Sequence, residues 1–167
     1  MRIINIGGVI NSGKSTVSKL LVERLSNSVF IEVDELLSDE EWVNFPDFMS
    51  RINERLNRLY KLLIKHVDSK QFDNIIFAYP MYDDTYSRVT EIAKDKAEFI
   101  IITLAPEIGI AQANRGTREL SEREKERILE MRDEGAYKYH KSDKIIDNTQ
   151  QSPTQTVNEI LEFLSHK

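Results

Sequence analysis

Short apolar stretches alternate with amphipathic segments along the whole chain. The apolar stretches are rich in β-branched residues and mostly uninterrupted, which is typical of strands buried on both faces of a sheet. They occupy residues 3–6, 29–33, 75–77 and 99–104, and a fifth covers residues 145–146. Around residues 17–25, 52–63 and 157–164, apolar side chains recur at three-to-four spacing, which predicts helices with one buried face.

This alternation predicts an α/β fold. Parallel strands need crossover connections, so the economical architecture is a parallel sheet covered by helices on both faces. Two helix starts are marked: Ser121 with Glu124 fits a capping box, and Ser152 with Gln155 forms a similar pair with a first-turn proline. No linker or repeat interrupts the pattern, so a single domain over residues 1–167 is expected. The acidic stretch at 32–47 is expected to be a connection that carries one short helix.

Composition narrows the function classes. Asp and Glu together number 28 against 23 Lys and Arg, and this net acidity argues against a partner such as DNA or RNA. No apolar run reaches the length of a membrane span, and the first residues lack an export signal, so a cytoplasmic protein without membrane contact is expected. With no cysteine and three scattered histidines, any metal should be bound by oxygen.

The segment GVINSGKS at residues 8–15 matches the phosphate-loop pattern GxxxxGK[ST] between a predicted strand and a predicted helix. Such a loop surrounds phosphates with backbone N–H groups, and the helix that follows presents its positive end. Lys14 would reach the β- and γ-phosphate oxygens, Ser15 would ligate magnesium and Thr16 would bind another phosphate oxygen. The alternative is a glycine-rich turn that contains a lysine by chance, but all four fixed positions of the pattern would then have to match by chance. The residues expected to bind ATP from this segment are Gly8, Asn11, Ser12, Gly13, Lys14, Ser15 and Thr16.

Two carboxylates follow the second predicted strand. Glu32 and Asp34 are two residues apart, so on a strand they share one face at the carboxyl edge, where open parallel sheets bind ligands. A carboxylate there can accept a proton from an acceptor hydroxyl or help to hold magnesium. The alternative is that both residues cap the next helix or face solvent.

Arg115 and Arg118 flank a glycine ahead of the capping-box helix. Mobile guanidinium groups on a closing loop can stabilise charge that develops on a phosphoryl group in transfer. The alternative is that both are ordinary surface arginines. The charge run at residues 122–127 is interpreted as a solvated helix face.

Other classes of phosphate-loop protein fit less well. A guanine-reading Asn-Lys-x-Asp segment and an Asp-x-x-Gly switch are absent, which argues against a GTPase. The third strand, at residues 74–80, ends in neutral residues and lacks the acidic pair of motor-like ATPases.

These features together resemble the nucleoside monophosphate, shikimate and gluconate kinase-like group of P-loop kinases over nearly the whole chain. Residues 30–35 resemble the Ile-Asp-x-Asp of shikimate kinases, with Glu32 at the magnesium-side acid and Asp34 at the acceptor-facing acid. The stretch from residue 104 to Arg115 and Arg118 resembles the strand and lid arginines, and residues 145–148 resemble the last strand.

The resemblance implies a five-stranded parallel sheet in the order 2-3-1-4-5, with helices on both faces and a small lid at about residues 114–136. ATP is the implied donor and Mg²⁺ the implied metal, held by Ser15 and Glu32. Arg115 would also contact ATP. The residues implied in catalysis are Lys14, Asp34, Arg115 and Arg118.

The acceptor is left open by departures from the family pattern. Residues 77–84 replace the Gly-Gly-Gly turn of shikimate kinases, and the gluconate-type lid histidine is missing after Arg118. A wall made of Tyr79, Tyr82, Asp83 and Asp84 would suit a nucleoside or another ring-bearing hydroxyl compound, and its tyrosines could equally be packing residues. Packing is also the interpretation favoured for Trp42, Phe45 and Phe48.

The sequence therefore predicts an ATP-dependent phosphotransferase that acts on a small-molecule hydroxyl or phosphate acceptor. One alternative is a nucleotide-binding regulator or slow ATPase without an acceptor. Another is a polynucleotide 5′-end kinase, against which the net acidity counts. Monomer and homodimer both remain open.

Overall fold

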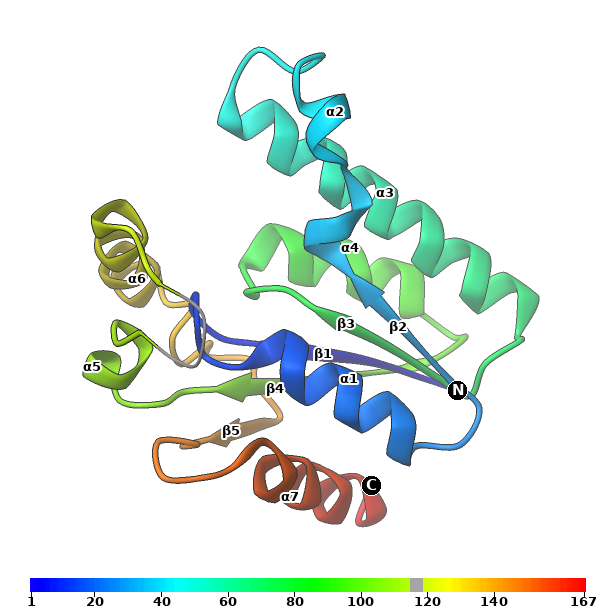
Figure 1. Cartoon of the computed structure of the whole chain (residues 1–167). Helices are drawn as coiled ribbons and strands as arrows, with labels where there is room; N and C mark the ends of the chain where they lie inside the picture. The colour runs from blue at the N-terminus through cyan, green and yellow to red at the C-terminus, as the bar shows by residue number, and fades with distance from the viewer. Residues whose placement is uncertain (115–118) are drawn as a thin grey trace.

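The computed structural model describes residues 1–114 and 119–167 and places five parallel strands in the order β2-β3-β1-β4-β5 within them (Figure 1). The strands are β1 (Arg2–Gly7), β2 (Ser28–Glu32), β3 (Asn74–Ala78), β4 (Glu98–Leu104) and β5 (Lys144–Ile146). Each predicted strand is present, and the order that the family resemblance implied is confirmed. Because neighbouring strands run in the same direction, their carboxyl ends meet at one edge of the sheet.

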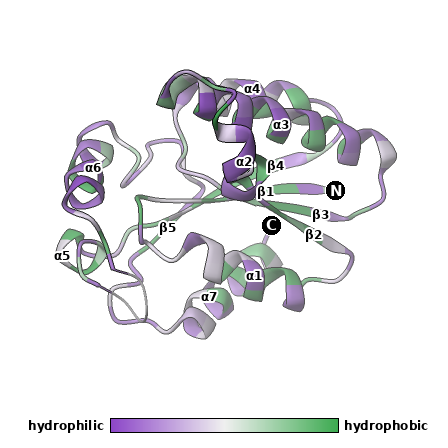
Figure 2. Ribbon diagram, turned by 45° about the horizontal axis from the view of Figure 1, so that its top comes forward, coloured by the Kyte–Doolittle hydropathy of each residue, from purple (hydrophilic) through white to green (hydrophobic). Residues whose placement is uncertain are grey.

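Helices cover both faces of the sheet. The helices α1 (Lys14–Arg24) and α7 (Pro153–Ser165) lie on one face, and α3 (Phe48–Ser69) and α4 (Asp83–Ala93) lie on the other (Figure 1). Side chains alternate between the faces, so Ile4 packs toward α1 and α7 while Ile3 packs toward α3 and α4. The strands are apolar on both faces, as Figure 2 shows by their green colour. This burial explains why the strand stretches carry few polar residues.

The remaining elements lie around the carboxyl edge of the sheet. They are the 3₁₀ helix η1 (Val33–Leu36) and the α-helices α2 (Asp39–Trp42), α5 (Ile108–Ala111) and α6 (Glu122–Asp133). The connection after β2 thus carries two short helices, where the sequence predicted one. Ile128 and Met131 of α6 pack in a buried cluster with Val9 and Ala111, which places α6 beside the loop after β1.

Both predicted capping boxes are present. The Ser121 hydroxyl accepts a hydrogen bond from the Glu124 backbone N–H at 3.2 Å, and Ser152 does the same for Gln155 at 3.3 Å. These local bonds satisfy N–H groups that have no partner within the helix, so they set where α6 and α7 begin. In the part of the chain that the structure describes, a helix with the length and apolarity to cross a membrane is absent.

Candidate active site

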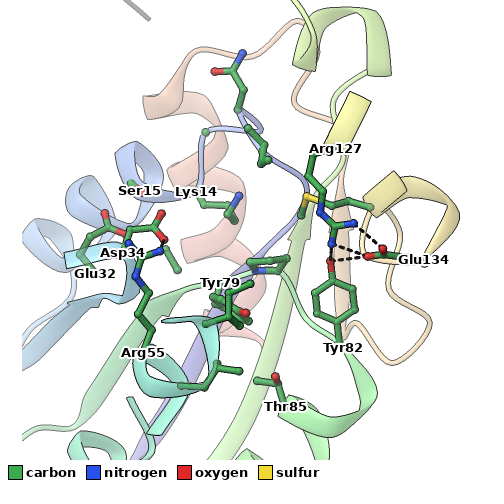
Figure 3. Close-up of a pocket in the computed structure, with 18 of the residues that line it drawn as sticks. Lys14, Ser15, Glu32, Asp34, Arg55, Tyr79, Tyr82, Thr85, Arg127 and Glu134 are labelled. Carbon is green, nitrogen blue, oxygen red and sulfur yellow. Dashed lines mark hydrogen bonds and ion pairs between the residues drawn. The ribbon is translucent and has the colours of Figure 1, made fainter. Parts of the chain in front are cut away.

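A cavity of about 1120 Å³ opens at the carboxyl edge of the sheet (Figure 3). Residues 10–11 and 13–17 form its floor, and Glu32 and Asp34 lie on one side with the first turns of α3. The opposite side is formed by α6, and residues from the segments 78–85 and 148–156, Asp83 not among them, complete the lining. Six segments that are separate in sequence therefore meet around one space large enough for two small molecules.

Glycine is required at the start of the phosphate loop. Gly8 has a φ of 126°, and a Cβ added there would lie 2.3 Å from the Leu104 carbonyl oxygen of β4. Gly13, at the other end of the loop, has a φ of 97° and is the N-cap residue of α1. Both positions need the left-handed region that glycine tolerates, and at Gly8 the neighbouring strand also excludes any side chain.

Side chains from distant segments hold the loop in place. The Asn11 amide donates to the Ala111 and Ala113 carbonyl oxygens, both at 2.9 Å. The buried Asn148 amide donates to the Ser12 carbonyl oxygen at 3.0 Å. These bonds tie the loop to α5 and to the segment after β5, so it is shaped before any nucleotide arrives.

The predicted ATP residues divide into two groups. Asn11, Gly13, Lys14, Ser15 and Thr16 line the cavity, whereas Gly8 and the fully buried Ser12 lie beneath it and shape the loop. The Lys14 Nζ donates to the Val9 carbonyl oxygen at 2.6 Å, which holds the ammonium group over the loop. The first turn of α1 has no side-chain cap, unlike α2, α3, α6 and α7, and the N-terminus of this helix lines the cavity.

Glu32 and Ser15 form an oxygen pair at the end of β2. The Ser15 side chain lies beside the Glu32 carboxylate and acts to lower its pKa, and both residues line the cavity. Burial raises the pKa of Glu32, and the Ser15 side chain partly opposes this rise. A hydroxyl beside a carboxylate matches the donors that Mg²⁺ prefers, with phosphate oxygens and water to complete its shell. Groups of three or more acidic, histidine or cysteine side chains around one metal position are absent from the described residues.

Asp34 lies on the same side of the cavity but not on the strand. β2 ends at Glu32, and Asp34 lies in η1. The expectation that the two carboxylates share one face of a strand was therefore wrong. The tight turn still brings both to the cavity. The Arg55 Nη1 of α3 lies 3.3 Å from the Asp34 Oδ1, and the Asp34 side chain is 80% exposed while that of Arg55 is 18% exposed. Figure 3 shows this pair beside Glu32, across the cavity from Arg127.

A second charged network lines the α6 side. The Arg127 guanidinium contacts the Glu134 carboxylate at 2.6 and 2.8 Å and the Glu130 carboxylate at 3.0 Å. The Tyr82 hydroxyl donates to Glu134 at 3.1 Å, which connects the start of α4 to α6. Burial raises the pKa of Tyr82, so this hydroxyl stays protonated. The interpretation of residues 122–127 as a solvated face was therefore incomplete, because Arg123 and Arg127 line the cavity.

The proposed aromatic and acidic wall is only partly assembled. Tyr79, Tyr82 and Asp84 line the cavity, and burial raises the pKa of Tyr79 to about 12, so it is a hydrogen-bond donor at neutral pH. Asp83 does not line it, because its carboxylate accepts bonds from the Tyr139 hydroxyl at 2.7 Å and the Lys141 ammonium at 3.0 Å. Phe48, which the sequence assigned to packing, lines the cavity instead and is 64% exposed.

The site residues predicted from the sequence and the residues that line the cavity do not fully agree. Arg115 and Arg118 lie outside the described residues. Arg55 and Arg127 face the cavity but were missed, since an arginine on an amphipathic helix gives no local signal that separates a site residue from a solvated one. Their partners, Asp34 and Tyr82, had been singled out, and only the fold brings each pair together.

Comparison with known proteins supports one family. The family model described as shikimate kinase matches residues 10–165. No curated protein sequence matches this chain significantly. The chain is similar in structure to a shikimate kinase from Aquifex aeolicus, with a TM-score of 0.68, 20% identity and coverage of 99% of this chain and 97% of that one. It is also similar to a gluconokinase from Sinorhizobium meliloti 1021, with a TM-score of 0.71, 17% identity and coverage of 99% and 91%.

A third solved structure is a shikimate kinase from Acinetobacter baumannii in complex with shikimate. It has a TM-score of 0.69 and 17% identity, with coverage of 99% of this chain and 94% of that one. At these identities the structural likeness concerns the fold, and the acceptor of this chain has to be argued from its own cavity.

Proposed function

The chain belongs to the shikimate kinase family, and on that premise we propose that it transfers the γ-phosphoryl group of ATP to a hydroxyl of a small molecule held beside Asp34. The protein is an ATP-dependent phosphotransferase of the P-loop kinase class. One observation carries the proposal: the phosphate loop and the Asp34 carboxylate line the same cavity. We also propose that residues 1–167 form a single domain and that the protein is located in the cytoplasm, where ATP is available.

The donor end would be formed by the phosphate loop. The N–H groups of the loop and of the first turn of α1 would bind the phosphates, and the Lys14 ammonium would leave the Val9 carbonyl for the β- and γ-phosphate oxygens. Ser15 and Glu32 would hold Mg²⁺, which neutralises phosphate charge when it is bound. In this proposal Arg115 and Arg118 would approach the γ-phosphoryl group from the lid.

The acceptor end would be formed by Asp34, Arg55 and the α6 side. The exposed Asp34 carboxylate would accept the proton of the attacking hydroxyl, while Arg55 holds that carboxylate in place. The hydroxyl oxygen forms a bond to the γ-phosphorus as the bond to the β-γ bridging oxygen breaks, and ADP leaves. Since this transition state is loose, positioning and charge neutralisation supply most of the acceleration.

The proposal is tested by ATP consumption with Mg²⁺ across a panel of nucleosides, polyols, sugar acids, shikimate, nucleotides and oligonucleotide ends. Strong stimulation by one small hydroxyl compound, with formation of its phosphate ester, is the expected result. ATP hydrolysis that no compound accelerates would replace this function by the regulator or slow ATPase. Stimulation by oligonucleotide ends alone would favour the polynucleotide kinase.

Replacing Glu32 by glutamine should raise the Mg²⁺ concentration that activity requires and should also raise the unfolding temperature of the metal-free protein. The amide keeps an oxygen for Ser15 but loses the negative charge, so the Mg²⁺ concentration for half-maximal activity should rise roughly 10- to 100-fold. Burial raises the pKa of Glu32, so the protonated side chain stabilises the fold fully below the ordinary carboxyl pKa. This stabilisation is lost as the pH rises through the raised pKa and the side chain becomes charged. At neutral pH the metal-free variant should therefore unfold at a higher temperature than the wild type.

The matched control for this prediction is Glu23→Gln on the exposed face of α1. That variant should leave both the Mg²⁺ dependence and the unfolding temperature unchanged. A Glu32→Gln protein with wild-type Mg²⁺ dependence would remove Glu32 from the proposed metal site.

A further inference from the structure

We propose that Asn5 is a positioning residue for the acceptor half of the cavity, the part that Asp34, Tyr79 and Tyr82 line. Asn5 fixes the backbone of Tyr79, and the Tyr79 hydroxyl donates a hydrogen bond to the acceptor. The inference rests on the proposed function and assigns one acceptor contact, with its support, to named residues. It also explains why an amide side chain lies in the core of the sheet.

Asn5 occupies a place in the sheet where an apolar residue is expected. It lies in the central strand β1, in register with Phe77 of β3 and Ile101 of β4, and it is fully buried. Its Nδ2 donates to the Tyr79 carbonyl oxygen at 3.0 Å, and its Oδ1 has no hydrogen-bond partner among the described residues. Because a buried polar atom without a partner destabilises a fold, an asparagine here indicates a role other than stability.

The Asn5 amide continues the hydrogen bonding between β1 and β3 beyond the end of their ladder. The register of the two strands ends at Ile6 and Ala78, and the Tyr79 N–H still donates to the Ile6 carbonyl oxygen at 3.3 Å. β1 then ends at Gly7, where the chain leaves the sheet for the phosphate loop. The Tyr79 carbonyl oxygen therefore receives its hydrogen bond from a side chain, because the main chain of β1 has turned away.

The backbone of Tyr79 is thus held on both sides of its Cα. Its N–H and its carbonyl oxygen are both bonded to β1, and Pro80, which follows it, restricts it to an extended conformation. A side chain on such a constrained backbone has few positions open to it, so its hydroxyl is placed before an acceptor binds. Loss of the Asn5 amide removes one of these three constraints.

The Tyr79 side chain lies between the two charged sides of the cavity. Figure 3 shows it between the pair of Asp34 and Arg55 and the residues on the α6 side. Burial raises the pKa of Tyr79 to about 12, and the Asp34 charge adds to this rise. The Arg55 and Arg127 charges oppose it, so the hydroxyl lies within electrostatic reach of both sides. It is protonated at neutral pH and makes no hydrogen bond to a described residue, so it can donate one to an acceptor beside Asp34.

The position of Tyr79 can be followed without an acceptor by fluorine NMR of protein that contains meta-fluorotyrosine. Tyr79 is one of six tyrosines, and its signal is assigned by its absence from Tyr79→Phe. In Asn5→Val the amide is lost, so the Tyr79 signal should shift or broaden. Thr103→Val is the matched control, because Thr103 is also fully buried beside Gly7 but its hydroxyl hydrogen-bonds to that of Ser142 at 2.7 Å. This control should leave the Tyr79 signal unchanged.

Steady-state kinetics tests the role of the Tyr79 hydroxyl, with the compound of the acceptor panel that stimulates ATP consumption most. Asn5→Val should raise the KM of that compound about tenfold without changing the KM of ATP, and Tyr79→Phe should do the same. The double variant should be no worse than either single variant, because both changes remove the same contact. Asn5→Ala, which cannot overfill the core, should show the same change in KM. Thr103→Val should lower the unfolding temperature and leave both KM values unchanged.

An unchanged Tyr79 signal in Asn5→Val would overturn the positioning role. Increases in KM that multiply in the double variant would overturn it as well, because Asn5 would then act by a route other than Tyr79. A protein that phosphorylates one compound of the panel with an unchanged KM in Asn5→Val contradicts only this inference. A protein that phosphorylates no compound contradicts the proposed function itself, whatever the fluorine spectra show.

Discussion

Lys14→Ala should lower kcat by about three orders of magnitude while the protein remains folded. The Lys14 ammonium is held over the phosphate loop, 2.6 Å from the Val9 carbonyl oxygen, and it lines the cavity. Without it, the charge that develops on the transferring phosphoryl group loses a positioned cation, and comparable losses of one such donor cost about 10²- to 10³-fold or more. Steady-state kinetics with the best acceptor measures the change, and circular dichroism with thermal unfolding checks the fold.

Lys19→Ala is the matched control, since Lys19 lies on the same helix with 59% of its side chain exposed and only a 4.0 Å contact to Glu35. It should retain wild-type kcat. If Lys14→Ala kept more than about a tenth of the activity, the ammonium group would not act on the phosphates and the donor site would have to be sought elsewhere.

Asp34→Asn should lower kcat by roughly 10²- to 10³-fold with little change in ATP affinity. The amide has the shape of the carboxylate and can still offer its oxygen to Arg55, which lies 3.3 Å away, but it cannot take up the acceptor proton. A rapid-quench measurement of phosphoryl transfer, combined with a separate titration of ATP, distinguishes the chemical step from nucleotide binding.

Glu35→Gln is the control for Asp34, because Glu35 belongs to the same 3₁₀ turn but is 74% exposed and lies outside the cavity lining. Its kcat should be unchanged. An Asp34→Asn protein with normal kcat and a raised acceptor KM would show that Asp34 only positions the acceptor, and the role of base would then be withdrawn.

Much of the fold was predictable because its signals are local. The phosphate-loop pattern at residues 8–15 appears between a strand and a helix, and the structure places it between β1 and α1. The capping boxes at Ser121 and Ser152 each involve residues only three apart, so they could be recognised without knowledge of the fold. The sheet order came from the family resemblance, since alternation alone leaves several orders open.

The candidate site was predictable only where its residues follow strand ends. Glu32 and Asp34 follow β2, and Tyr79 and Tyr82 follow β3, so their types and positions already indicated a ligand edge. Phe48 gave no such signal, because an apolar residue at the start of an amphipathic helix is expected to be buried. Its exposure results from the position of α3, whose first turn lies against the cavity.

The sequence by itself determined the phosphate loop, the α/β alternation and the acids after β2, because each depends on residues that are neighbours in the chain. Only the tertiary structure decided which charges neutralise one another in the cavity. Asp34 and Arg55 are 21 residues apart, and Tyr82 and Glu134 are 52 apart, so no local pattern links them. Packing of α3 and α6 on either side of the sheet edge brings these pairs together, and the charge left to meet an acceptor is a property of that packing.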